Sequence, residues 1–357
     1  MKALKKISYG IIIFILFIKC TEIIEIDTTS IQSKIVLNGV IDADSTIEVY
    51  LSRSYPYIHT DTFNSYRYIK LANLENPSVK LYINDISKGN MNDAGIDSYN
   101  GAIFTSDYRP KVGDLIKIEV SAPGFKSVWA ETQIPEPIII QKIDTATFYE
   151  KKENDSKYYY NLGNTEVPFG AQNLNLKLKI DIQNKESNKT NYYSLSIFQR
   201  INNSFYINAP KINVTNEPLL NENNAKNAIY AFFSEKNDSY TSLFTDNTFT
   251  NNKYSLNLSI WGYYFYSVEA YYDDGRKDIE MHNSPIEISI TSLSKECYDY
   301  YKLSFQKSSY EEIPYIFDTK STYSNVHNGI GVLCSKSISK KLIELPPFTG
   351  KIFSDEK

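Results

Sequence analysis

Apolar and polar residues alternate along much of the first half of the chain, in short segments that end at turn-forming residues. The strand-forming segments of this half are residues 34–41, 47–51, 79–83, 103–105, 115–120 and 128–134. A period of two places one face of each strand in a core and the other face in water. Turn sequences such as Pro123-Gly124 stand between the segments. Many short strands separated in this way predict an antiparallel β-sandwich.

The second half of the chain repeats the period of two. Its strand-forming segments are residues 174–182, 193–197, 254–260 and 286–290. Asn251-Asn252 and Asp273-Asp274-Gly275 predict hairpin turns, because Asn, Asp and Gly accept a positive φ. Polar, Asn-rich stretches near residues 149–169 and 202–227 are interpreted as long loops. The expected fold class is therefore mainly all-β, with two antiparallel β-sandwich-like domains.

Pro135-Glu136-Pro137 marks the expected boundary between these domains, because neither proline can donate a hydrogen bond to a strand ladder. Residues 33–136 are predicted to form an N-terminal Ig-like or regulatory-like β-sandwich. Residues 137–350 are predicted to form a C-terminal β-rich domain. The length of 357 residues is compatible with two domains of ordinary size.

One short helix is expected near the C-terminus. Ser294 could cap it, and Glu296 in the first turn would favour the helix dipole. The apolar residues at four-residue spacing are Leu293, Cys297, Tyr301 and Phe305. Such a stripe indicates packing against a core rather than a ligand site.

The first twenty residues have the pattern of an export signal. Lys2, Lys5 and Lys6 precede an apolar run at residues 7–18, which is shorter than the roughly 20 residues that span a bilayer. Cys20 stands where cleavage is expected. This arrangement predicts a lipoprotein with an acyl or diacylglycerol lipid on Cys20. Residues 1–19 are then the signal peptide, and residues 20–32 are a lipidated tether that attaches the protein to a membrane.

Lys19 departs from the usual lipoprotein signal, which carries a small residue before the cysteine. The alternatives are cleavage nearby by an ordinary signal peptidase and retention of a short N-terminal anchor. The acidic residues Glu22, Glu25 and Asp27 resemble a signal that sends lipoproteins to the outer face of the outer membrane. The expected location is therefore the cell outer membrane, lipid-anchored and facing outward.

Composition narrows the class of function. A hydrophobic content of 42% with 22% charged residues is typical of a globular chain. The net charge of −4 gives no electrostatic basis for binding nucleic acid. Thirty tyrosines suit half-buried strands and also binding surfaces. Aromatic segments at residues 55–68 and 261–272 are candidates for ligand binding, although one face of a strand there would belong to the core.

The sequence contains no G-x-S-x-G motif, no H-E-x-x-H motif and no phosphate-binding Gly-rich loop. Enzyme activity, a metal and a cofactor other than the N-terminal lipid are therefore not expected. His59, His282 and His327 are isolated and indicate no site. Asp42-Ala43-Asp44 and Asp273-Asp274-Gly275 are interpreted as turns rather than Ca²⁺ sites.

Cys297 and Cys334 are the cysteines that remain when Cys20 carries the lipid. In an exported protein they could form a disulfide, and two buried free thiols are the alternative. The spacing leaves both interpretations open, because the distance between the two residues depends on the fold.

Five segments carry a resemblance to a known family. They are residues 34–39, 49–54, 77–81 and 113–120, and the motif Tyr323-Ser324-Asn325-Val326-His327-Asn328-Gly329-Ile330-Gly331. Over nearly its whole length the chain resembles the lipoproteins of Bacteroidota catalogued as domain of unknown function 4249. The resemblance implies an outer-membrane lipoprotein, often encoded beside a TonB-dependent transporter. It implies no activity and no catalytic residues.

The last motif also has a physical interpretation. Asn325, Asn328, Gly329 and Gly331 can adopt positive φ or form Asx turns, which predicts a structural loop that leads into a strand. His327 could bind a ligand within that loop. We expect a non-catalytic accessory or ligand-capture subunit of a TonB-dependent transporter. The alternatives are a structural or adhesive envelope lipoprotein and an unrecognised hydrolase.

Overall fold

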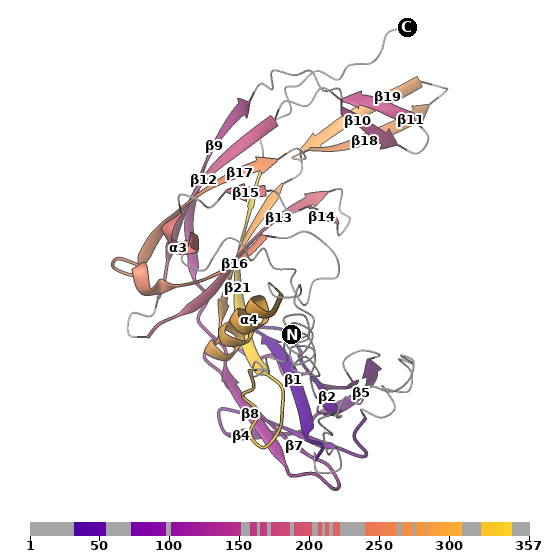
Figure 1. Ribbon diagram of the computed structural model, residues 1–357, viewed down its shortest axis with the longest axis vertical. Helices are drawn as coiled ribbons and strands as arrows, with labels where there is room; N and C mark the ends of the chain where they lie inside the picture. Colours follow the sequence, from indigo (N-terminus) through magenta and orange to yellow (C-terminus); the bar gives the residue numbers. More distant parts are fainter. Residues whose placement is uncertain are drawn as a thin grey trace, which may run out of the picture.

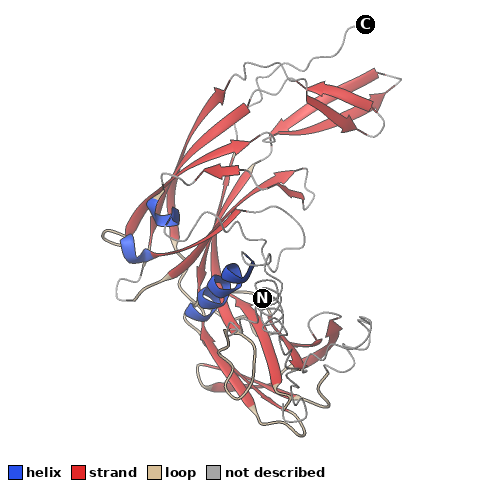
Figure 2. Cartoon of the chain, in the orientation of Figure 1, coloured by secondary structure: helices blue, strands red, loops and turns tan. Residues whose placement is uncertain are grey.

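The computed structural model describes fifteen segments of the chain. They are residues 32–54, 73–97, 101–150, 158–162, 165–169, 173–185, 189–201, 206–208, 211–213, 217–221, 240–262, 266–273, 276–283, 285–308 and 323–344. These residues form several β-sheets and few helices, which confirms the mainly β fold class (Figure 2).

The N-terminal sandwich consists of two antiparallel sheets. One contains, in spatial order, β1 (Ile35–Asp42), β2 (Ile47–Arg53), β6 (Gly101–Ser106) and β5 (Asn92–Asp97). The other contains β4 (Ile86–Asn90), β3 (Ser78–Ile83), β7 (Leu115–Ser121) and β8 (Val128–Gln133). Alternate residues of β1, β2 and β7 are buried, as the period of two predicts. Leu37, Val49 and Ile118 are among the fully buried residues of the core between the sheets.

The C-terminal sandwich has a second core between two further layers. One layer contains β14 (Tyr206–Asn208), β13 (Tyr192–Ile201), β20 (Ile286–Leu293) and β21 (Leu333–Ile343), and β16 (Tyr240–Thr245) pairs with β13. The other contains β15 (Lys211–Asn213), β17 (Lys253–Gly262), β12 (Asn173–Gln183) and β9 (Ile139–Glu150). Two separate hairpins pair β10 (Tyr158–Leu162) with β11 (Thr165–Phe169) and β18 (Tyr266–Asp273) with β19 (Arg276–Asn283). Leu178, Leu256 and Ile288 belong to the second core.

A single nine-stranded sheet runs through both sandwiches, because β21 joins them (Figure 1). Strand β21 pairs antiparallel with β20 and parallel with β1, where Gly39 lies opposite Leu333. Ile134 packs in the core of the first sandwich, and Ile138 packs in the core of the second. Val326 and Leu333, however, pack in the first core. The C-terminal part of the chain therefore completes the N-terminal sandwich.

Serine side chains of β21 bind the segment that connects the two sandwiches. Ser335 Oγ donates to the Gln133 carbonyl at 2.6 Å, and Ser337 Oγ donates to the Pro135 carbonyl at 2.8 Å. Ser339 Oγ donates to the Ile138 carbonyl. A serine at every second position of the strand thus donates to a carbonyl of residues 133–138, where the two prolines supply no N–H donors of their own. We call Ser335, Ser337 and Ser339 the serine row.

The predicted helix is confirmed as α4 (Lys295–Ser308). The Cys297 N–H donates to Ser294 Oγ at 3.4 Å, and Glu296 lies in the first turn. Leu293 and Cys297 are buried in a small third cluster, and Tyr301 packs against it. The side chain of Phe305 lies outside the described residues.

The predicted long loops were wrong where the structure describes them. Residues 149–169 contain β10 and β11, and residues 202–227 contain β14, β15 and the short helix α3 (Pro218–Asn221). Strands β4 and β5 were not predicted, because nearly all their residues are exposed and show no apolar alternation. The Asn251-Asn252 turn is confirmed, with φ values of 51° and 61° between β17 and the short 3-10 helix η2 (Asp246–Thr248).

Candidate functional site around Trp129 and His327

The family motif forms a backbone bridge between the two sheets of the N-terminal sandwich. The His327 N–H donates to the Trp129 carbonyl of β8 at 2.8 Å. The Ile330 N–H donates to the Ile35 carbonyl of β1 at 3.0 Å, and the Leu37 N–H donates to the Ile330 carbonyl at 2.9 Å. Residues 323–332 therefore hold an edge strand of one sheet to β1 of the other. We call them the clasp.

The asparagines of the clasp bind backbone groups. Asn325 Nδ2 donates to the Leu333 carbonyl at 2.7 Å, and its Oδ1 accepts from the Leu333 N–H at 3.0 Å. Asn328 has a φ of 60° and donates from Nδ2 to the Ser127 carbonyl at 3.4 Å. These contacts fix the conformation of the clasp, so both asparagines have structural roles.

The glycines of the clasp allow close approach to β1. A Cβ atom at Gly329 would lie 2.8 Å from the Ile35 carbonyl oxygen. One at Gly331, where φ is 117°, would lie 2.1 Å from the Leu37 carbonyl oxygen. No side chain fits at such distances, which explains both glycines without a ligand.

A row of aromatic and charged side chains covers the outer face of the β3, β7 and β8 strands beside the clasp. The His327 and Trp129 rings are stacked, with centroids 3.8 Å apart and planes at 9°. Lys117 Nζ lies 5.0 Å from the Trp129 centroid and 5.6 Å from the Tyr82 centroid. Glu119 lies beside Lys117 on β7. His327 is exposed, whereas the other four residues are partly buried. We call these five residues the aromatic row.

Charge within the aromatic row is compensated. Lys117 Nζ lies 2.7 Å from Glu119 Oε1, and the Tyr82 hydroxyl donates to Glu119 Oε2 at 3.1 Å. The bond from Lys117 lowers the pKa of Glu119, and the same bond raises the pKa of Lys117. The row is therefore a surface of hydrogen-bonding groups and aromatic rings. Such a surface can contact a polar ligand or another protein.

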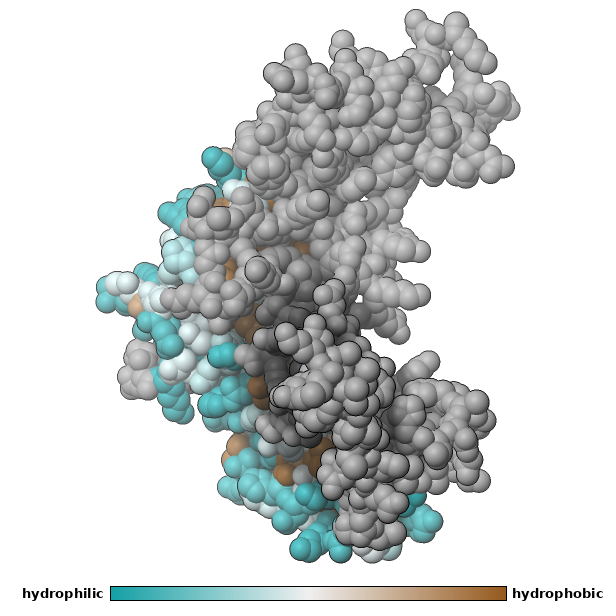
Figure 3. Space-filling view, in the orientation of Figure 1, coloured by the Kyte–Doolittle hydropathy of each residue, from teal (hydrophilic) through white to brown (hydrophobic). Residues whose placement is uncertain are grey.

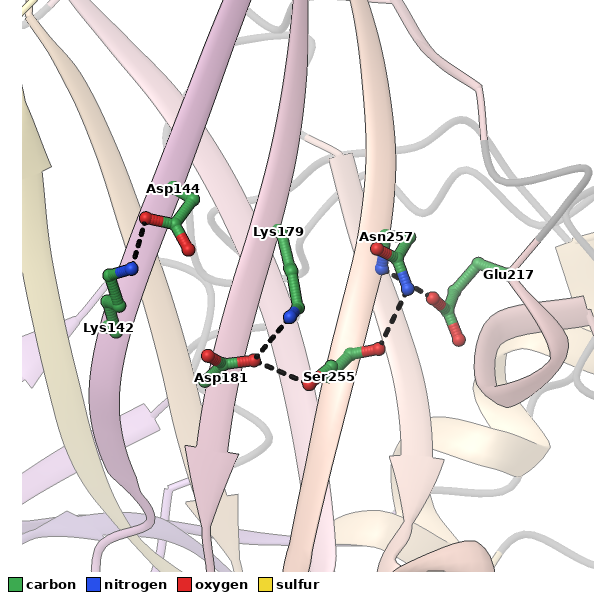
Figure 4. Close-up of polar contacts among 7 residues, drawn as sticks. All are labelled: Lys142, Asp144, Lys179, Asp181, Glu217, Ser255 and Asn257. Atoms are coloured by element: carbon green, nitrogen blue, oxygen red, sulfur yellow. Dashed lines mark hydrogen bonds and ion pairs between the residues drawn. The ribbon is translucent and has the colours of Figure 1, made fainter.

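A second polar surface covers the outer face of β9, β12 and β17 (Figure 4). Asp144 pairs with Lys142 at 2.7 Å. Asp181 lies 3.9 Å from Lys179 and accepts a hydrogen bond from the Ser255 hydroxyl. Asp144 is exposed and Asp181 is partly buried, and each is paired with a lysine of its own strand, which is the ordinary pattern on the solvent-facing side of a sheet.

Glu217 closes the edge of this second surface. Its Oε2 accepts from the Asn257 N–H at 2.7 Å, and its Oε1 accepts from the Tyr254 hydroxyl at 2.7 Å and the Leu219 N–H at 3.2 Å. Glu217 is 1% exposed and stands immediately before α3. Burial, together with the bond to Glu217, raises the pKa of Tyr254 to about 12. Glu217 thus accepts hydrogen bonds from a backbone N–H of β17 and from one at the start of α3, and it has a structural role.

Several sequence candidates lie outside the described residues or only partly within them. Cys20 and residues 55–68, with His59, are outside. Residues 261–262 belong to the backbone of β17, residues 266–272 to that of β18 and His282 to that of β19, but their side chains are not described. Asp42 ends β1 and pairs with Lys336 at 3.5 Å, and the turn follows at Ala43 and Asp44, where Asp44 has a φ of 63°. Cys297 and Cys334 are brought together.

The aromatic row was not predicted from the sequence. The sequence placed His327 among the isolated histidines and within its own motif, and Trp129 only within a strand. The usable signal was the position of Trp129, since a large aromatic residue on the polar face of a strand is informative. Its partner could not be inferred, because the two residues are far apart in the chain.

The described residues contain neither a metal-binding group nor a membrane-spanning helix. No three His, Cys, Asp or Glu side chains among them lie together so as to hold a metal ion. None of the helices in these segments is both long and apolar enough to cross a membrane. Figure 3 shows that the described surface on one face is largely hydrophilic.

The pKa of Asp114, at the turn before β7, gives a pH test of the N-terminal sandwich. Partial burial opposes ionisation, but bonds from the Lys111 N–H, Asn84 and Tyr108 outweigh it and lower the Asp114 pKa. The carboxylate therefore stabilises the fold above its unfolded pKa of 3.8, and this contribution is lost as the pH falls through the lower folded pKa.

We expect Asp114→Asn to weaken the fold at pH 6 and to reduce the loss of stability between pH 6 and pH 3. Urea unfolding midpoints at the two pH values measure this difference. Asp93→Asn, in the exposed strand β5, is the control. Equal falls in the midpoint for wild type and Asp114→Asn would contradict the assignment.

The comparisons with known proteins give one match. The sequence profile of a family described as "Domain of unknown function (DUF4249)" matches residues 21–341. No curated protein and no solved structure matches the chain.

Proposed function

The chain belongs to the DUF4249 family, and from this premise we propose that it is an outer-membrane lipoprotein that faces outward and assists a TonB-dependent nutrient transporter. Its part would be that of a non-catalytic accessory or ligand-capture subunit. The observation that carries the proposal is the N-terminal sequence, in which three lysines and the apolar run at residues 7–18 precede Cys20. The transporter partner is proposed from the family resemblance.

The position of the first strand supports a membrane-proximal N-terminal sandwich. Strand β1 begins at Ile35, fifteen residues after Cys20. At most about 3.5 Å per residue, this stretch reaches roughly 50 Å. A lipid on Cys20 would therefore hold the start of β1 within that distance of the bilayer. The N-terminal sandwich, which carries the aromatic row, would then be available to the extracellular side of a transporter.

The first experiment tests lipidation. Cells producing the tagged wild type, Cys20→Ser or Cys297→Ser are grown with a labelled fatty acid, and the purified proteins are assayed for label. Wild type and Cys297→Ser should carry label, and Cys20→Ser should carry none. Label on Cys20→Ser, or absence of label from the wild type, would overturn the lipoprotein assignment.

The second experiment tests the partner. C-terminally tagged protein is purified from detergent-solubilised outer membranes, and co-purifying proteins are identified by mass spectrometry. A stoichiometric TonB-dependent barrel is expected. A lipidated protein that is purified alone would overturn the accessory role and favour a structural or adhesive one.

The aromatic row provides a matched pair of variants for the same purification. Trp129→Ala with His327→Ala removes the stacked rings, and Lys142→Ala with Asp144→Ala removes an exposed ion pair of the other sandwich. If the row contacts the transporter, the first variant should lower recovery of the barrel at least about tenfold, which corresponds to about 1.4 kcal/mol. Equal recovery with both variants would exclude the row as the contact.

A further inference from the structure

Helix α4 packs beside β21 (Figure 1). Cys297 and Cys334 come from these two elements and are in contact. Cys297 lies in the first turn of α4, Cys334 is the second residue of β21, and their Sγ atoms are 2.8 Å apart. Both are free cysteines, and they are 0% and 1% exposed. The chain thus places two sulfur atoms in direct contact from segments 37 residues apart.

The environment of the two sulfurs is apolar and closely packed. Leu243, Leu293 and Val332 are buried in the same cluster, and Tyr301 packs against it. The separation of 2.8 Å is shorter than the roughly 3.5–4.0 Å optimum for two carbon atoms, and sulfur is the larger atom. A covalent bond of about 2.05 Å needs the sulfurs to move by less than about 1 Å. Bond formation would therefore leave α4 and β21 in place.

We propose that Cys297 and Cys334 form a disulfide in the mature, exported protein. The two thiols lose two protons and two electrons. The disulfide of a thiol–disulfide oxidoreductase in the export compartment accepts them and becomes a dithiol. One cysteine thiolate first attacks that disulfide to give a mixed disulfide, and the second thiolate then displaces the oxidoreductase. The supply of oxidant rests on the proposed export, whereas the proximity of the sulfurs does not.

The burial of the pair determines when the bond forms. The hydrogen bond with Cys297, together with burial, raises the pKa of Cys334. The folded, reduced protein therefore contains little of the thiolate that performs exchange. The disulfide must form while α4 is still docking onto β21. A protein that has folded with both thiols reduced will oxidise slowly.

The disulfide would stabilise the clasp. The segment between Cys297 and Cys334 contains residues 323–332, which hold β8 to β1. Joining the two ends of this segment restricts the unfolded chain and so favours the folded clasp. The bond would thereby stabilise the connection between α4 and the N-terminal sandwich.

The test uses full-length protein purified from the cell envelope with free thiols blocked at lysis. Proteolysis without reductant and mass spectrometry should give a peptide pair linked through Cys297 and Cys334, lighter by two hydrogens than the reduced pair. Reductant should separate the pair and lower the melting temperature by about 5 °C. The Cys297→Ala, Cys334→Ala double variant should show no effect of reductant.

A second experiment tests whether the disulfide can form independently of whether the protein is exported. Protein made in the cytosol is refolded in a buffer of reduced and oxidised glutathione and analysed in the same way. Linked peptides in both samples support the proposal. Free thiols in the envelope sample overturn the proposal. If the refolded sample is nevertheless linked, the protein does not meet an oxidant during export. If the thiols are free in both samples, the geometry does not permit the bond. Because wild type with and without reductant supplies the main comparison, the test does not depend on folding of the variants.

Discussion

Replacing Gly331 with alanine is expected to destabilise the N-terminal sandwich by more than about 4 kcal/mol, enough to prevent folding in cells. The added Cβ would lie 2.1 Å from the Leu37 carbonyl oxygen, a backbone atom of the central strand β1. To relieve this steric clash, the clasp has to move away from β1. That movement breaks the hydrogen bond of the Leu37 N–H with Ile330 and the bond of the Gly39 N–H with Val332.

Gly124 is the matched control for Gly331. It also has a positive φ, of 79°, but no atom lies within 4 Å of its added Cβ. Gly124→Ala should therefore show only the backbone cost of about 1–2 kcal/mol. Soluble yield and urea unfolding of both variants measure the difference. Similar stabilities would contradict the close approach of the clasp to β1.

Removing the serine row is the second large expected effect. The triple variant Ser335→Ala, Ser337→Ala and Ser339→Ala should lose about 3–5 kcal/mol in total, because each lost hydroxyl leaves a linker carbonyl without its donor. Ser335 and Ser337 are 0% and 2% exposed, so water cannot easily replace them. The loss should weaken the joint between the two sandwiches.

Thermal unfolding followed by calorimetry tests this expectation. The triple variant should unfold at a lower temperature, and its single transition should broaden or divide as the two sandwiches become independent. Ser45→Ala with Ser121→Ala, at exposed positions, is the control and should change stability by less than about 0.5 kcal/mol. A triple variant as stable as this control would show that the row does not support the joint.

Part of the candidate site followed from local sequence. Positive φ or Asx turns were predicted for four residues of the motif. Asn328 and Gly331 have φ values of 60° and 117°, whereas Asn325 and Gly329 have no positive φ. Local steric rules determine which residue types tolerate such angles. The stacking of His327 on Trp129 did not follow, because it depends on which strand edge the clasp reaches.

The sequence alone determined the mainly β class, ten of the twenty-one described strands and helix α4, because burial on one face imposes a period of two on strands and a recurrent apolar stripe on helices. Strands β4 and β5 were among the strands not predicted, because nearly all of their residues are exposed to solvent. Only the tertiary structure decided the parallel pairing of β1 with β21, the binding of the linker by the serine row, and the meeting of Cys297 with Cys334. Each joins residues distant in the chain, and local propensity carries no information on which sheet edge is free to receive a returning strand.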